Sequence, residues 1–143
     1  MLSLNIKLTD REFQYLMHIY NLSIESGRAV YSDELARIMG VKQSSSISVL
    51  HRLREKGLII YEPRAGAFLT KIGRNIAESI IHRHRILEKF LVDYLKMTPK
   101  EACVESINIQ LNFSEKTIEK LCLLLSKPNV CPCGKHIPHP HSR

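Results

Sequence analysis

The segment SDELARIMGVKQSSSISVLHRLREKGL, residues 32–58, decides the fold of this chain. Its first part has apolar residues at helical spacing, with Ser32 placed to cap the helix and Gly40 to end it. After a tight turn, a second helix is predicted from about Gln43 to Lys56, with inward positions at Ser46, Val49, Leu50 and Leu53. Two short helices joined by such a turn are typical of a helix-turn-helix.

The sequence on either side predicts a winged form of this motif. A capping box of Thr9 and Glu12 begins an earlier helix, and Gly27 ends it. After the motif, two β-rich runs at 58–62 and 67–70 flank a Pro/Gly turn, and this pattern predicts a β-hairpin. A helix-turn-helix followed by a hairpin is a winged helix, so we expect that fold here.

The rest of the chain is predicted to be helical. Thr70 is placed to cap a long helix over 71–95, and two shorter helices follow, capped by Thr98 and Ser114. We therefore expect a mainly α fold: an N-terminal winged helix-turn-helix followed by a helical domain. The expected divisions are a DNA-binding domain (1–72), the helical domain (73–128) and a Cys/His-rich tail (129–143).

Basic charge is concentrated on the predicted helix-turn-helix and its wing. The chain has a net charge of +7, and residues 42–74 hold seven basic residues against two acidic ones. Such an excess favours a polyanionic partner. Small polar or basic side chains of the second helix and the wing are expected to contact DNA: Lys42, Gln43, Ser44, Ser45, Ser48, Arg52 and Arg64. The alternative is a solvated polar helix in a three-helix core.

The composition indicates where in the cell the protein is found and which state its cysteines are in. No apolar run approaches the roughly 20 residues that span a bilayer, and the N-terminus lacks the pattern of a signal peptide. We therefore expect a cytoplasmic protein, in which the four cysteines are thiols or metal ligands rather than disulfides. Cys122 is expected to be a small core residue, and His82 a surface residue.

Four segments resemble a known family: YLMHIYNL (15–22), residues 32–62, LTKIGRNIAESIIHRHRILEKFL (69–91) and CPCGKHIP (131–138). The chain resembles the diphtheria-toxin-repressor and manganese-transport-regulator family of metal-dependent, including iron-dependent, transcriptional repressors. This resemblance implies a homodimer that binds double-stranded operator DNA through the winged helix. It also implies that the helical domain is a metal-binding and dimerisation domain, and that it binds Mn(II), Fe(II) or a similar ion.

The family's principal metal site is incomplete when it is carried onto this chain. His84 and Glu105 stand at two ligand positions, but the next two positions hold Asn108 and Ile109. The ligand positions in the first helix hold neutral residues, Gln14 and Met17. Because isoleucine cannot ligate and the amides are weak donors, we expect this site not to survive in intact form.

The family's ancillary site suggests a second donor set. The resemblance places ligands at His84, Glu88 and Glu101, and Glu105 lies one helical turn from Glu101. His84 and Glu88 are four residues apart and share a helix face, and such donors suit Zn(II), Fe(II) or Mn(II). The alternative is a histidine–carboxylate hydrogen bond on a polar face, with Glu101 serving only as a helix cap.

The tail CPCGKHIPHPH, residues 131–141, is a third candidate for a metal site. It offers the N and S donors that Zn(II) prefers: Cys131, Cys133, His136, His139 and His141. Members of the family carry a similar C-P-x-G-x-x-I-P tail. The alternative is therefore a metal-free turn set by Pro132 and Gly134, with Ile137 docked on the helical domain.

The sequence leaves three functions to compare. The leading hypothesis is a dimeric DNA-binding transcriptional regulator, specifically a metal-responsive repressor. The alternative is a metal-binding or thiol-redox module that uses its winged helix for protein–protein contact, with the C-P-C dithiol as the redox group. An enzyme is not expected, because the sequence has no Gly-rich phosphate loop, no H-E-x-x-H and no nucleophile with an adjacent base.

Overall fold

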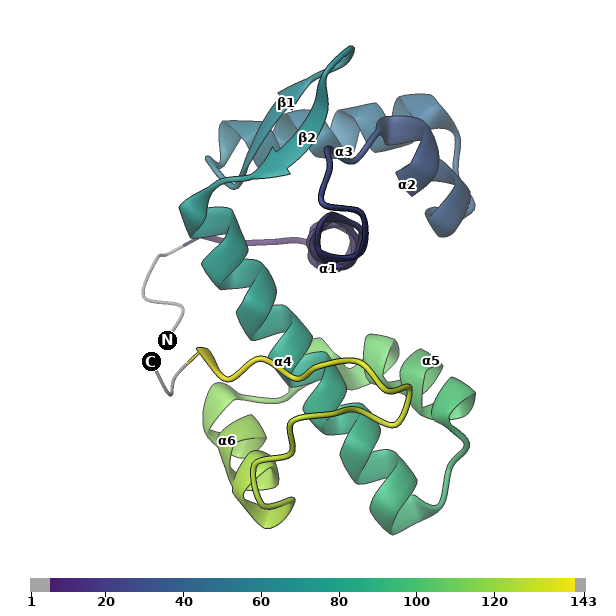
Figure 1. Cartoon of the computed structure of the whole chain (residues 1–143), viewed down its shortest axis with the longest axis vertical. Helices are drawn as coiled ribbons and strands as arrows, with labels where there is room; N and C mark the ends of the chain where they lie inside the picture. The colour runs from purple at the N-terminus through teal and green to yellow at the C-terminus, as the bar shows by residue number, and fades with distance from the viewer. Residues whose placement is uncertain (1–5, 141–143) are drawn as a thin grey trace. The chain divides into compact units, whose positions relative to one another are not determined.

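A computed structural model describes residues 6–140 and divides the chain into two compact units that meet between Ala77 and Glu78. The first unit holds the helices α1 (Asp10–Ser26), α2 (Ser32–Met39) and α3 (Gln43–Glu55) and the strands β1 (Ile59–Glu62) and β2 (Gly66–Leu69). The second unit holds α5 (Pro99–Ile109), the 3-10 turn η1 (Gln110–Asn112) and α6 (Glu115–Leu124). Helix α4 (Lys71–Leu95) runs through the boundary (Figure 1). The predicted mainly α fold with an N-terminal winged helix is confirmed.

The helix ends follow the local chemistry of the sequence, with one correction. Thr9 caps α1 by accepting a hydrogen bond from the Glu12 N–H at 3.2 Å, as predicted. Ser32 does not cap α2, because the extended N-cap position falls on Tyr31 and Ser32 is already helical. The Tyr31 N–H instead donates to the Glu34 carboxylate at 2.9 Å, so an acidic side chain begins this helix.

Helix α3 is held by the inward stripe that its spacing predicts. Val49, Leu50 and Leu53 are buried to 2% exposure or less. Ser46 is also fully buried, and its hydroxyl hydrogen-bonds the Tyr15 hydroxyl of α1 at 2.7 Å. A polar residue is tolerated in this core because its hydrogen-bonding capacity is satisfied. The opposite face of α3 is left for solvent or a partner.

The wing is a two-stranded antiparallel sheet that is joined closely to α4. Its register pairs Ile59 with Leu69 and Glu62 with Gly66. Thr70 begins α4 by accepting from the Gly73 N–H at 3.0 Å, and it donates to the Gly57 carbonyl at 2.7 Å. A Cβ at Gly73 would lie 1.8 Å from the Leu58 carbonyl oxygen, so only glycine fits where α4 passes this backbone.

The second unit buries its core between α4, α6 and the C-terminal tail. Its buried apolar cluster comprises Ile86, Leu87, Ile118, Cys122, Cys131 and Ile137. The tail passes α6 and crosses α4 (Figure 1, yellow). Its turn is closed by the Gly134 N–H bonding the Cys131 carbonyl at 2.9 Å, and the docking of Ile137 is confirmed. No helix in the described part of the chain combines the length and apolar character needed to cross a bilayer.

Candidate metal centre and nucleic-acid interface

Three potential metal ligands meet in the second unit, on α4 and α5. His84 Nε2 lies 2.7 Å from Glu88 Oε1 and 3.6 Å from Cys103 Sγ. One donor atom from each residue lies within 4.8 Å of the others. His84 and Glu88 are 5% and 3% exposed, and Cys103 is partly buried. We refer to His84, Glu88 and Cys103 as the His84 centre.

A buried glutamine orients the histidine of this centre. Gln110 is 1% exposed, and its Oε1 lies 2.9 Å from His84 Nδ1. An amide oxygen only accepts hydrogen bonds, so Nδ1 carries a proton and Nε2 is directed at Glu88 and Cys103. Metal-bound histidines are commonly fixed through their second nitrogen in this way.

The His84 centre holds a proton when no metal is present. Burial lowers the pKa of His84, but Cys103 and Glu88 outweigh that effect through hydrogen bonds and charge and raise the pKa to about 9. A metal must therefore displace this proton to bind Nε2. The donors are one imidazole, one carboxylate and one thiol, a set that fits a divalent transition metal.

Cys133 borders the His84 centre, and Ser106 lies on the same helix as Cys103. Cys133 Sγ of the tail lies 3.8 Å from Glu88 Oε2, and burial together with the Glu88 charge raises the pKa of this thiol. Ser106 lies one turn after Cys103 on α5, and its hydroxyl is buried without a hydrogen-bond partner among the described residues. A water or a metal-bound ligand would satisfy this hydroxyl.

Of the predicted His84, Glu88 and Glu101 set, the structure brings the first two together and places Glu101 elsewhere. The Glu101 side chain is exposed and accepts from the Thr98 N–H at 2.9 Å, which, with the Thr98 hydroxyl, lowers its pKa. Cys103 stands beside His84 in its place, and Glu105 is not among the three grouped donors. If the resemblance is shifted by two residues along α5, Cys103 takes the ligand position given to Glu105, and the two positions without donors fall on Ser106 and Ile107.

The tail residues do not gather into the predicted Cys131, Cys133 and His136 set. Cys131 is buried in the apolar cluster, Cys133 faces Glu88, and His136 is exposed. His139 instead lies beside Cys122, and His141 is outside the described residues. His82, expected at the surface, is only 6% exposed because the tail covers it and the Pro138 carbonyl lies 2.7 Å from its Nδ1.

The predicted DNA-contacting residues form an exposed group at the N-terminal half of α3. Lys42 is the N-cap residue of this helix, and all of the following are exposed: Lys42, Gln43, Ser44, Ser45 and Ser48. The Gln43 amide donates to the Ser32 hydroxyl at 3.0 Å, which fixes the turn between α2 and α3. Arg64 is exposed in the turn of the wing.

Arg52 differs from the other predicted DNA contacts because it has an internal partner. Its Nε lies 3.3 Å from Oε1 of Glu12, a carboxylate whose side chain is only 1% exposed. Lys56 Nζ binds the second oxygen at 2.5 Å. Burial raises the pKa of Glu12, but Lys56, Thr9 and Arg52 outweigh it and lower the pKa. Arg52 therefore has a structural role in holding α3 against α1.

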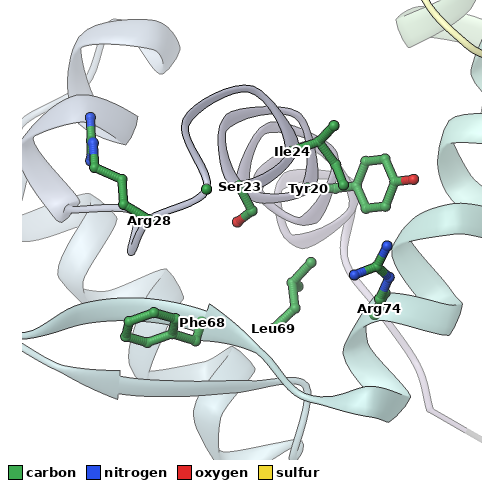
Figure 2. Close-up of a pocket in the computed structure, with 8 residues that line it drawn as sticks. Tyr20, Ser23, Ile24, Arg28, Phe68, Leu69 and Arg74 are labelled. Carbon is green, nitrogen blue, oxygen red and sulfur yellow. The ribbon is translucent and has the colours of Figure 1, made fainter.

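The first unit also contains a small hollow of about 220 Å³ (Figure 2). Residues of α1, β2 and the start of α4, with Arg28 from the loop after α1, line it. Its walls combine Phe68, Leu69 and Ile24 with two arginines, Arg28 and Arg74. Arg28 is already paired with Glu34. The hollow involves no residue of α3, so it is separate from the predicted DNA-contacting group.

Comparisons with known proteins match both parts of the chain to one family of regulators. Residues 7–67 match the family model described as the N-terminal DNA binding domain of the iron dependent repressor. Residues 70–139 match its metal binding and dimerisation domain. This chain belongs to the iron-dependent repressor family. It is thus a DNA-binding transcriptional regulator with a domain for divalent metal and dimerisation, and the predicted resemblance is confirmed.

Individual relatives support the family assignment. Over 113 residues the chain is 30% identical to an uncharacterized HTH-type transcriptional regulator of Methanocaldococcus jannaschii, covering 79% of this chain and 90% of that one. It is 34% identical to the transcriptional regulator MntR of Escherichia coli over 113 residues, 79% of this chain and 72% of the relative.

Solved structures share the fold of this chain. A hypothetical protein from Sulfolobus solfataricus has a TM-score of 0.70 at 31% identity, over 92% of this chain and all (100%) of that one. A manganese-dependent transcriptional repressor in complex with manganese has a TM-score of 0.83 at 29% identity, over 90% of this chain. The chain spans only 58% of the length of that repressor.

Proposed function

We propose that this chain is a metal-responsive repressor that binds operator DNA as a homodimer and senses its metal at the His84 centre. The observation that carries the proposal is the approach of three different donors, from His84, Glu88 and Cys103, to within 4.8 Å of one another. The second ring nitrogen of His84 is also held by Gln110, as is common for histidines that bind a metal. The activity proposed is regulated binding and not catalysis, and it takes place in the cytoplasm.

The donor set favours Zn(II) or Fe(II) over Mn(II). A thiolate is a soft ligand and suits zinc and iron, whereas Mn(II) prefers carboxylate, carbonyl and water oxygens. Glu88 and the Cys103 thiolate would together neutralise a divalent ion in this buried location. Cys133, which lies 3.8 Å from Glu88, and Ser106, one helical turn after Cys103, are candidates to complete or adjust the coordination.

Metal binding at the His84 centre can change the conformation of the second unit through the tail. Cys133 lies 3.8 Å from Glu88 and follows Cys131, which is buried in the apolar cluster. A metal that draws Cys133 inward would also stabilise the turn at Gly134. Regulation requires that the metal bind one conformation more tightly than the other, and this turn is a segment in which such a difference can arise.

The proposed DNA-binding domain is residues 1–72, with domain limits of 73–128 and 129–143 for the helical domain and tail. The exposed start of α3 provides hydroxyl, amide and ammonium groups for base edges and phosphates. One such helix reads only a few base pairs, so two copies are needed for a long operator.

Val104, Leu123 and Leu124 are more than half exposed in the second unit, and we assign them to the dimer interface.

The test uses the full chain and a random double-stranded DNA library. Sequences selected by the chain are then titrated without metal and with saturating Zn(II), Fe(II) or Mn(II) at fixed salt. We expect an operator to be selected and its affinity to rise about 5- to 150-fold with Zn(II) or Fe(II). Failure to select any sequence would contradict the DNA-binding role. Equal affinity with and without all three metals would contradict metal sensing at the His84 centre.

A further inference from the structure

A second group of potential ligands lies in the same unit and joins three distant segments. It consists of His82 on α4, Cys122 on α6 and His139 in the tail, each with a donor atom within 4.8 Å of the others. Cys122 Sγ is 3.9 Å from His139 Nδ1, and the two imidazole centroids are 5.1 Å apart at an angle of 69°. None of these residues belongs to the His84 centre.

Both histidines direct their second ring nitrogen at a backbone carbonyl. His82 Nδ1 lies 2.7 Å from the Pro138 oxygen, and His139 Nε2 lies 2.8 Å from the Pro128 oxygen. A carbonyl oxygen only accepts, so these nitrogens carry the protons. In the neutral imidazoles the lone pairs are then on His82 Nε2 and His139 Nδ1. Histidines that bind metal typically donate their other N–H to a carbonyl or carboxylate in this way.

The surroundings of the group suit a structural metal. His82 and Cys122 are each 6% exposed, and His139 is partly exposed, so the group is mostly shielded while one side is accessible to water. Two neutral imidazoles and one thiolate leave a divalent ion with a single net positive charge. Zn(II) takes such nitrogen and sulfur donors in a tetrahedron, and a water molecule can occupy the fourth position.

The cysteine alone does not explain this arrangement. Burial raises the pKa of the Cys122 thiol, so without a metal it is a neutral thiol making a weak hydrogen bond to His139. That bond would not require His82 to lie against the same ring. A bound metal accounts for all three side chains, because each would supply one ligand.

We propose that His82, Cys122 and His139 bind one Zn(II) ion that ties the C-terminal tail to α4 and α6. The nearest cysteines of the tail do not belong to this site, because Cys131 lies in the apolar cluster and Cys133 faces Glu88. The tail therefore supplies its ligand through His139, after the residue that docks in the core, Ile137. This zinc fixes the tail whether or not the His84 centre is loaded.

The experiment measures zinc in a full-length chain whose His84 centre has been disabled by His84→Ala and Cys103→Ser. After loading with Zn(II) and desalting, we expect one zinc per chain by elemental analysis. Adding His139→Ala or Cys122→Ser should remove it, whereas adding His136→Ala, an exposed histidine of the same tail, should not. Circular dichroism identifies folded variants, and His139→Ala removes no side chain of the apolar core.

Cobalt gives an independent readout of the sulfur ligand. Co(II) bound to the same disabled chain should show a thiolate-to-cobalt charge-transfer band that Cys122→Ser removes and Cys133→Ser retains. A disabled chain without zinc, or zinc that persists in a folded His139→Ala chain, overturns the proposal. Because these readouts are stoichiometry and spectra, they are independent of operator affinity, which tests the proposed function.

Discussion

His84 Nε2 lies 2.7 Å from Glu88 Oε1, so the helix turn that carries both residues contains a buried ion pair when His84 is protonated. Cys103, on a separate helix, adds a third group to the same nitrogen. A protonated imidazole and a bound metal are mutually exclusive at Nε2. The centre therefore has two states, one held by a proton and one by a metal, and each has a measurable consequence.

The stability of the metal-free protein should fall as the pH rises above neutrality. The pKa of His84 is raised to about 9 in the folded chain, against about 6.5 when unfolded. The stabilisation is fully present below pH 6.5 and is lost as the pH rises through 9, with a loss of up to roughly 3 kcal/mol. Urea unfolding with a chelator, between pH 6 and 10, measures it. Glu88→Gln should flatten the profile, and an unchanged slope in that variant would contradict the ion pair.

Metal-dependent operator binding should depend on Cys103 and not on Glu105. Cys103→Ser removes the sulfur ligand next to His84, so most of the gain in DNA affinity with Zn(II) should be lost. Glu105→Gln, on the same helix, is the matched control and should keep the gain. Fluorescence anisotropy with labelled operator measures both variants. Loss of the gain in Glu105→Gln alone would instead favour the original placement of the ligand.

Lys42, the N-cap residue of α3, and Arg52, within that helix, should have different effects on DNA binding. Lys42→Ala removes an exposed charge and should lower the dependence of log affinity on log salt by about one per half-site. Arg52→Ala should leave that slope nearly unchanged but lower the free energy of unfolding by about 1–3 kcal/mol, because buried Glu12 loses a partner. Equal losses of salt dependence in the two variants would show that Arg52 contacts phosphate.

Helix α4 should not tolerate a side chain at position 73. Gly73→Ala puts a Cβ 1.8 Å from the Leu58 carbonyl oxygen, and relieving this overlap requires moving the backbone at Leu58 away from α4. We expect a loss of more than about 3 kcal/mol in the free energy of unfolding. Gly27→Ala meets nothing within 4 Å and is strained only by its φ of 64°, so it should cost about 1–2 kcal/mol. Similar losses in the two variants would contradict the close approach.

Charge on the exposed leucines of α6 should separate the dimer. Leu123 and Leu124 are 62% and 54% exposed, and replacing both by glutamate would bury two charges in the assigned interface. Analytical ultracentrifugation should then find monomers, and operator affinity should fall by more than ten-fold. Lys120→Glu, exposed on the same helix, tests charge alone and should leave the dimer intact. A dimer that survives both leucine substitutions would place the interface elsewhere.

Local chemistry made much of the fold predictable. The Thr9 and Thr98 capping boxes, the glycines after α1 and α2 and the span of α4 all follow from residues adjacent in the chain. The cap of α2 was misplaced by one residue, because Tyr31 has an extended backbone and Glu34 supplies the hydrogen bond. Neighbouring residues could not show which of two adjacent positions would be extended.

The candidate ligands were less predictable because they come from separate helices. His84 and Glu88 could be paired from their spacing on α4, but Glu101 and Cys103 are two residues apart on α5 and face different surroundings. No pattern in the sequence predicted that Gln110 would hydrogen-bond His84 and orient its ring. A shift of two positions in the resemblance to the family would have identified Cys103.

The sequence by itself determined the helices, the wing, the excess of basic residues near α3 and the family, because each depends on patterns that are local or shared among relatives. Only the tertiary structure decided which donors meet. It brought Cys103 to His84 and His139 to Cys122, and it covered His82 with the tail. The reason is physical: a ligand set is defined by distances of a few ångströms between segments that lie far apart along the chain. Those distances are set by packing of the shared core, which no single segment encodes.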